Sequence, residues 1–261
     1  MVIHLTTHSA YSLQEGLATP AELVQAAQAH GMSALGLTDH NLLTGAVEFV
    51  TACKDAGVQP ILGLEIDLEQ GPLQLLAMSA EGWSNLCRLS STLALRDKPE
   101  GVCTLEMLSA YSKDLIAFGA IQLEELKNIF QDRLYISLRH PSNVGRLSDL
   151  ARKLSLPAVV AHPIYYLSPE QAQLQKTLTA IRLNKTLKDI PSNAIAPADS
   201  YFMSAQEMES RFRDYPEALA ATTEIAERCR FDLPFGKAHM PTVPLPPGIS
   251  ATEFLRQKAY A

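Results

Sequence analysis

The chain has 261 residues, of which 47% are hydrophobic and 19% charged, a composition typical of a globular protein with one sizeable core. The formal net charge of −6 argues against nonspecific DNA binding by this chain alone, because a surface that neutralises many phosphates is normally basic. Four scattered cysteines without a CxxC pair, no secretory signal and no apolar run near the roughly 18 residues of a membrane span predict a reduced, cytoplasmic protein without a membrane partner.

Short β-rich segments alternate with helical segments through the first two-thirds of the chain. The first helix is well marked, since Thr19 can cap it, Pro20 begins it and Glu22 completes a capping box. Further helices are predicted at about Thr44–Ala56, Gly82–Leu95, Glu124–Phe130 and Asn143–Leu154, and strands at Val2–Leu5, Ala34–Leu37, Val58–Leu64, Leu73–Ala77, Leu115–Phe118, Leu134–Leu138 and Pro157–Ala161. This alternation predicts parallel βα units that right-handed crossovers would close into a barrel or a wound sheet.

After residue 168 the chain changes to helices and proline-rich connections. Helices are predicted at Pro169–Asn184, Ser204–Phe212 and Tyr215–Arg230, followed by an extended stretch at Pro234–Pro247 and a last helix from about Ser250. We therefore expect a barrel over residues 1–190 and a helical, proline-rich extension over residues 191–261 that packs on it. The last helix meets Ala261 without a C-cap, which predicts that the natural sequence continues. A locally basic group in this part is interpreted as a solvated face: Lys176, Arg182, Lys185 and Lys188.

Ionisable side chains gather where the predicted strands end. They are His4, His8, Glu15, Asp39, His40, Glu65, His140 and His162. In a βα barrel the chemistry lies at the C-terminal ends of the strands, where loops bring such side chains together. Because imidazole and carboxylate ligands together suit Zn, Mn or Fe, the pattern predicts a metal site, past or present, at this end of the barrel.

Several motifs also occur in a fixed order along nearly the whole chain. They are His4–Gly16 (HLTTHSAYSLQEG), Ala34–His40 (ALGLTDH), Gly45–Phe49 (GAVEF), Gln59–Glu65, Gly82–Ser90 (GWSNLCRLS), Tyr135–His140, Leu156–Leu167, Ser204–Phe212 and Pro216–Cys229. Together they resemble the PHP (polymerase and histidinol phosphatase) domain, in the version carried at the N-terminus of bacterial DNA polymerase III α subunits. The resemblance implies an α/β fold, a distorted seven-stranded βα barrel, with a cleft for up to three metals; active members hydrolyse phosphoesters.

The resemblance carries only part of the family's ligand set onto this sequence. The positions that match are His8, Glu15, His40, Glu65 and His140, whereas Thr6, Pro72, Pro163 and Tyr165 stand where other ligands are expected. His4 lies outside the expected His-x-His pair, which implies a structural role. Because proline has no coordinating side chain and Thr and Tyr are poor or uncommon ligands, the resemblance implies a degenerate site without catalytic residues. Such a site holds no cofactor, or one residual Zn, Mn or Fe ion with His162 as a replacement ligand.

We therefore predict the N-terminal PHP domain of a replicative DNA polymerase III α subunit, acting in DNA replication as a structural and docking module. The parent protein would be a DNA-directed DNA polymerase, a nucleotidyltransferase, while this part is not catalytic. The implied partners are the polymerase core of the same chain and the proofreading exonuclease subunit, with DNA reached only through the full-length protein. Two alternatives stay open: a metal-dependent phosphoesterase or proofreading PHP domain, and the PHP domain of the error-prone polymerase paralogue.

Overall fold

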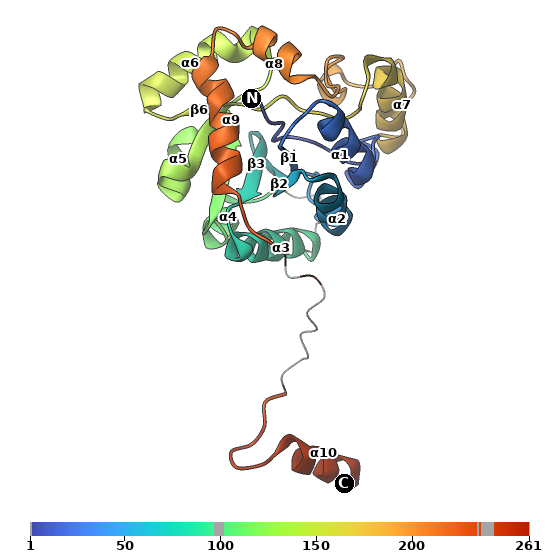
Figure 1. The fold of residues 1–261 in the computed structure, drawn as a ribbon, viewed down its shortest axis with the longest axis vertical. Coiled ribbons are helices and arrows are strands. Elements are labelled where there is room, and N and C mark those ends of the chain that lie inside the picture. The colour runs from blue at the N-terminus through green and yellow to red at the C-terminus, as the bar shows by residue number, and fades with distance from the viewer. Residues whose placement is uncertain (1, 97–101, 234, 236–242, 261) are drawn as a thin grey trace. The chain divides into compact units, whose positions relative to one another are not determined.

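The computed structural model describes residues 2–96, 102–233, 235 and 243–260. Met1–Phe231 form one compact unit and Asp232–Ala261 a second. The first unit contains one curled six-stranded sheet, whose strand order follows the chain, with helices packed around it (Figure 1). Its strands are β1 (Ala34–Leu37), β2 (Gln59–Leu68), β3 (Gly71–Ala77), β4 (Leu115–Gly119), β5 (Leu134–Leu138) and β6 (Ala158–Val160).

The helices follow the predicted pattern closely, with one addition, α4. They are α1 (Pro20–Ala29), α2 (Ala46–Ala56), α3 (Ala80–Ala94), α4 (Leu105–Ala110), α5 (Leu123–Phe130), α6 (Pro141–Leu154), α7 (Ala172–Arg182), α8 (Ala205–Arg211) and α9 (Pro216–Arg228), with α10 (Ala251–Tyr260) in the second unit. The capping box at Thr19 and Glu22 forms as predicted. Much of the predicted proline-rich stretch, residues 234 and 236–242, lies outside the described residues. In the part of the chain that the structure describes, no helix is both long and apolar enough to cross a membrane.

The expectation of uniformly parallel units is wrong in the middle of the sheet. β3 runs antiparallel to both β2 and β4, while the remaining neighbours are parallel. β2 continues past the predicted end at Leu64 to Leu68, and only residues 69 and 70 separate it from β3. A two-residue connection can join antiparallel strands only, because a parallel crossover needs a dozen residues or more.

Residues 4–8, which take in the second half of the predicted strand Val2–Leu5, do not form a regular strand. The His4 and Thr7 carbonyls accept hydrogen bonds from the N–H groups of Gly36 and Thr38. On the other side, this segment exchanges backbone hydrogen bonds with Ile164, just beyond β6. His4 and Thr7 are three residues apart, whereas their partners Gly36 and Thr38 are two residues apart. The segment therefore has one extra residue opposite β1, as in a β-bulge. The described residues therefore form a sheet of six strands, and this segment links the two edge strands in place of the predicted seventh.

Both faces of the sheet are apolar, as expected for strands covered on two sides. Along β4, Leu115 and Ala117 join the cluster that packs against the surrounding helices, while Ile116 and Phe118 join a second cluster. That second cluster also contains Ala221, Ile225 and Ala226 of α9, together with Cys229, which directly follows this helix. The extension after the barrel therefore contributes directly to the hydrophobic core.

A substitution at Gly36 tests the close approach between β1 and residues 4–8. A Cβ at Gly36 would lie 2.5 Å from the Leu5 carbonyl oxygen, so the backbone would have to shift. We expect Gly36→Ala to lower the free energy of unfolding by about 1–3 kcal/mol, the usual cost of overpacking. Urea denaturation measures it.

Gly145→Ala is the matched control, because Gly145 is an exposed residue within α6 with only Tyr215 Oη near its Cβ position, at 4.0 Å. It should stabilise the chain by about 0.5–1 kcal/mol through helix propensity. Equal effects of the two substitutions would contradict the close-packing argument.

Candidate functional site

A hollow of about 470 Å³, which we call the mouth pocket, gathers most of the predicted site residues. Its polar and ligand-position lining comprises Glu15, His40, Glu65, Asp67, Pro72, Arg139, His140, His162, Pro163, Tyr165, Gln175, Arg182 and Asp199. Four of the five matching ligand positions therefore lie around one pocket, as the sequence predicts: Glu15, His40, Glu65 and His140. His8 is fully buried next to the pocket, with its Nε2 atom 3.4 Å from Glu65 Oε1.

The loop that carries Glu15 is anchored by a buried carboxylate, Asp39. Asp39 accepts hydrogen bonds from the Ser9 N–H, the Ser9 hydroxyl and the Ser12 hydroxyl at 2.6–2.8 Å. Burial raises the pKa of Asp39, although the hydrogen bonds from Ser12 and Ser9 oppose the shift. Ser9 and Ser12 therefore fix the loop, and their partner is a carboxylate rather than a histidine base.

His40 lies between two carboxylates at the edge of the mouth pocket. Its Nδ1 is 3.1 Å from Glu15 Oε1, and its Nε2 is 2.9 Å from Asp67 Oδ2. Burial alone would lower the pKa of His40, but the hydrogen bonds to Asp67 and Glu15 raise it to about 10. Both ring nitrogens are then protonated and donate hydrogen bonds.

Glu15 receives a second cation from α7. The Arg182 Nη1 group donates to Glu15 Oε1 at 2.7 Å. Burial alone would raise the pKa of the Glu15 carboxyl, but the hydrogen bond from His40 and the charge of Arg182 lower it below its usual value. Glu15 is therefore an ionised acceptor between two cations.

Glu65 lies within β2, two residues before Asp67, and is buried among donors. Gln74, its cross-strand partner on β3, donates a side-chain hydrogen bond to Glu65 Oε2, and Arg139 Nη2 lies 3.3 Å from the same oxygen. Burial alone would raise the pKa of Glu65, whereas the neighbouring His8 and Arg139 lower it. Its carboxylate is thus ionised and satisfied by protein groups.

His140 lines the same pocket but has partners of its own. It caps α6, because its Nδ1 accepts the Ser142 N–H at 3.3 Å, and its Nε2 lies 3.3 Å from Asp199 Oδ2. Arg211 also contacts Asp199. His140 therefore belongs to a separate cluster at the rim of the pocket.

His4 and His162 are buried histidines, and each of them bonds to a backbone carbonyl group. His4 Nε2 donates to the Met203 carbonyl at 2.7 Å, and His162 Nε2 donates to the Tyr201 carbonyl at 3.1 Å. Burial lowers the pKa of His4 to about 3 and that of His162 to about 4, so both rings are neutral at neutral pH.

Four expected ligand positions carry Tyr165, Pro72, Pro163 and Thr6 in place of a metal-binding side chain. Tyr165 stacks on His8 with a centroid distance of 4.3 Å and an interplanar angle of 9°. Pro72 pairs with Asp67 in the β2–β3 ladder, and Pro163 lines the pocket. The buried Thr6 hydroxyl has no hydrogen-bond partner among the described residues.

These donors do not fit the cluster of up to three metals that the resemblance implies. Both nitrogens of His40 face carboxylates, and Glu15 and Glu65 already bind arginines. Within the described ranges, no group of three or more His, Cys, Asp or Glu side chains is arranged to hold a metal ion. What the arrangement does supply is a dense set of charge-assisted hydrogen bonds.

Four charged residues of the pocket were not predicted as site residues from the sequence: Asp67, Arg139, Arg182 and Asp199. Asp67 had a usable signal, because Leu64, Ile66 and Leu68 continue the alternation of β2 and place Asp67 on the same side as Glu65. The interpretation of Arg182 as part of a solvated basic face is wrong, since its guanidinium enters the mouth pocket.

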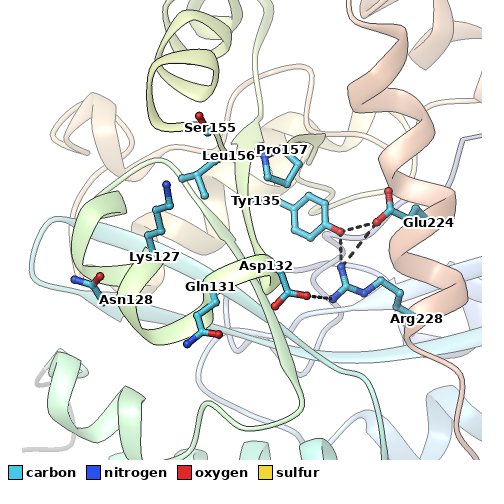
Figure 2. Close-up of a pocket in the computed structure, with 10 residues that line it drawn as sticks. All are labelled: Lys127, Asn128, Gln131, Asp132, Tyr135, Ser155, Leu156, Pro157, Glu224 and Arg228. Carbon is cyan, nitrogen blue, oxygen red and sulfur yellow. Dashed lines mark hydrogen bonds and ion pairs between the residues drawn. The ribbon is translucent and has the colours of Figure 1, made fainter.

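A second, larger hollow of about 800 Å³ lies near the amino ends of β5 and β6 (Figure 2). Figure 2 shows Arg228 of α9 reaching toward Tyr135, Glu224 and Asp132, with which it forms a hydrogen bond and two ion pairs. Lys127 donates to the Leu154 carbonyl. Since these charges have partners and this edge of the sheet carries stability rather than chemistry in βα barrels, the mouth pocket is the better candidate.

The PHP domain family matches residues 4–141, just over half of the chain. The DNA polymerase III α subunit of Bacillus subtilis (strain 168) is 33% identical over 284 residues, covering 97% of this chain and 25% of that protein. The error-prone DNA polymerase of Symbiobacterium thermophilum is 31% identical over 302 residues, covering 99% of this chain and 28% of that protein. The chain thus spans about a quarter of the length of these curated relatives.

The fold has a counterpart among solved structures. An amidohydrolase from Chromobacterium violaceum superimposes with a TM-score of 0.50 at 15% identity, covering 63% of this chain and 88% of that chain. This similarity supports the barrel-like α/β fold.

The two buried neutral histidines predict acid lability. Since folding lowers the pKa of His4 to about 3 and of His162 to about 4 from 6.5, the unfolded chain binds more protons as pH falls below 6.5. The stability contributed by these two histidines is therefore complete above pH 6.5 and is lost progressively down to about pH 4 for His162 and about pH 3 for His4. Each pKa unit corresponds to about 1.4 kcal/mol, so the total loss is several kcal/mol. Urea denaturation across this pH range measures it.

His4→Gln separates this effect from the titration of the pocket carboxylates. It keeps a donor for the Met203 carbonyl and should flatten the pH dependence between pH 6.5 and 4. Lys153→Gln, at an exposed lysine of α6, is the control and should leave the slope unchanged. Parallel curves for wild type and His4→Gln would rule out this origin.

Proposed function

The chain belongs to the PHP domain family, and from this premise we propose that it is the N-terminal PHP domain of a replicative DNA polymerase III α subunit. In this role it acts in DNA replication as a structural and docking module without phosphoesterase activity of its own. The observation that carries the proposal is the occupation of the surviving ligand positions by protein cations, Arg182 on Glu15 and Arg139 on Glu65. A hydrolytic metal centre needs those oxygens for metal ions with open coordination positions.

The remaining parts of the proposal follow from the relatives. The polymerase α subunit of Bacillus subtilis matches nearly the whole chain, which supports a polymerase core of the same chain as the first partner. A proofreading exonuclease subunit is the second proposed partner. The acidic net charge supports contact with DNA only through the full-length protein, and the proposed compartment is the cytoplasm. No cofactor is required, and the remnant ligands His8, Glu15, His40, Glu65 and His140 have a structural role.

The error-prone polymerase is a second candidate for the parent protein. Its support is the 32% identity of error-prone DNA polymerase 1 of Agrobacterium fabrum, close to the 33% of the replicative Bacillus subtilis subunit. The coding sequence after residue 261 tests both candidates. Continuation into a polymerase domain is expected, its sequence separates the two classes, and a stop codon at that point would refute the polymerase assignment.

An assay of phosphodiester hydrolysis tests the absence of catalysis. The purified 261-residue chain, incubated with bis(p-nitrophenyl) phosphate and added MnCl2 or ZnCl2, should release no nitrophenol above the protein-free rate. The physical reason is that the two ring nitrogens of His40 already face Glu15 and Asp67, and that Glu15 also binds Arg182.

The decisive controls are a double variant at the mouth pocket and a single variant elsewhere. Metal-dependent hydrolysis that disappears in His8→Ala/His40→Ala but persists in the exposed-site variant His30→Ala would refute the proposal. Hydrolysis that persists in both would identify a contaminating enzyme and leave the chain itself inactive.

A further inference from the structure

Two arginine side chains reach the mouth pocket from elements far apart in the sequence. Arg139 directly follows β5, and Arg182 is the last residue of α7. The Arg139 Nη2 atom lies 3.3 Å from Glu65 Oε2, and the Arg182 Nη1 atom lies 2.7 Å from Glu15 Oε1. Each arginine therefore contacts a carboxylate that matches a metal-ligand position of the family.

These two carboxylates need cations because they are largely removed from water. The side chains of Glu65 and Glu15 are only 7% and 12% exposed. A buried carboxylate without a partner is strongly unfavourable, and removing one partner of such a pair leaves that penalty uncompensated. In a metal-loaded site the metal ions would supply the positive charge, whereas here two guanidinium groups supply it.

The other carboxylates of the pocket are compensated in the same way. Asp67 contacts His40, and Asp199 contacts both Arg211 and His140. All four carboxylates that line the mouth pocket are thus within ion-pair distance of a basic side chain of this chain. The pocket is close to electroneutral without any added ion, which removes the main electrostatic drive for binding a divalent metal.

We propose that Arg139 and Arg182 are the resident cations of the mouth pocket, taking over the charge-balancing role of the family's metal ions and excluding divalent metal from Glu65 and Glu15. This inference rests on the proposed function, because it assumes a site that no longer performs metal-dependent hydrolysis. Guanidinium suits the task, since it stays protonated in proteins and presents several fixed N–H donors to carboxylates.

A double-mutant cycle tests the pairing of Arg182 with Glu15. We expect Arg182→Gln to lower the Tm by about 4 °C or more, because it removes one cation from the buried Glu15 carboxylate. In a chain of this size, a loss of roughly 1 kcal/mol in stability lowers the Tm by 2–4 °C. The double variant Arg182→Gln/Glu15→Gln should have a Tm loss clearly smaller than the sum of the losses in the two single variants, because Glu15→Gln removes the charge that Arg182→Gln leaves uncompensated. Additive effects would overturn the proposal.

The exposed pair Arg152 and Asp149 provides the matched control cycle. Its nitrogen–oxygen distance is 3.3 Å, but the side chains are 76% and 74% exposed, so water screens their interaction. Arg152→Gln and Asp149→Asn should each change the Tm little and show no measurable coupling. Coupling equal to that of the Arg182 pair would mean that burial in the mouth pocket is not the cause, and would overturn the proposal.

Metal titration tests the exclusion of divalent ions. In wild type, the Tm in EDTA and in excess MnCl2 or ZnCl2 should be the same, and dialysed protein should retain no stoichiometric metal by mass spectrometry. In Arg139→Gln/Arg182→Gln, added metal should raise the Tm, because Glu15 and Glu65 become available as ligands. Metal-dependent stabilisation of wild type, or none in the folded double variant, would overturn the proposal.

Where the double variant does not fold, stabilisation of wild type by added metal still overturns the proposal. The outcomes also separate this inference from the proposed function. Metal-dependent hydrolysis by wild type would refute the proposed function and, with it, the inference. A wild type that is inactive and metal-free but shows no coupling between Glu15 and Arg182 would refute the inference alone.

Discussion

Backbone hydrogen bonding on both sides of residues 4–8 is the constraint on which the mouth of the barrel depends. The segment accepts bonds from Gly36 and Thr38 on one side and exchanges bonds with Ile164 on the other. It therefore connects the first and last strands of a sheet that would otherwise have two open edges. Its approach to β1 is so close that position 36 has no room for a Cβ. The loop that follows this segment carries Glu15 to His40, so the geometry of the pocket depends on the same bonds.

Charge balance is the second constraint, and it sets what the mouth pocket can do. Buried carboxylates are tolerated only with partners, and the partners here are guanidinium and imidazolium groups of the chain itself. Such ion pairs are weak evidence for high stability, because desolvation offsets much of their attraction, but breaking one is costly. These ion pairs therefore connect β2, the loop at Glu15 and α7 around the pocket.

Most elements of this fold could be predicted from local patterns, and the exceptions have a common cause. The strands Ala34–Leu37 and Leu134–Leu138 and the capped start of α1 follow from burial pattern and capping chemistry. The direction of β3 did not follow, because the alternation of Leu64, Ile66 and Leu68 continues the strand beyond its predicted end. That continuation shortens the connection to two residues and reverses the direction of the next strand. A small error at one strand end thus changes the topology of the sheet.

By itself, the sequence determined the order of motifs, and the resemblance drawn from them implies that Thr6, Pro72, Pro163 and Tyr165 stand at ligand positions. Residue identity alone decides which of these side chains can coordinate a metal. The tertiary structure alone decided which cations meet the surviving carboxylates. Arg182 and Glu15 are 167 residues apart, and the helical pattern around Arg182 is equally compatible with a solvated face. Local periodicity reports which side of a helix is buried, whereas the pairing of two distant charges depends on how helix and barrel pack together.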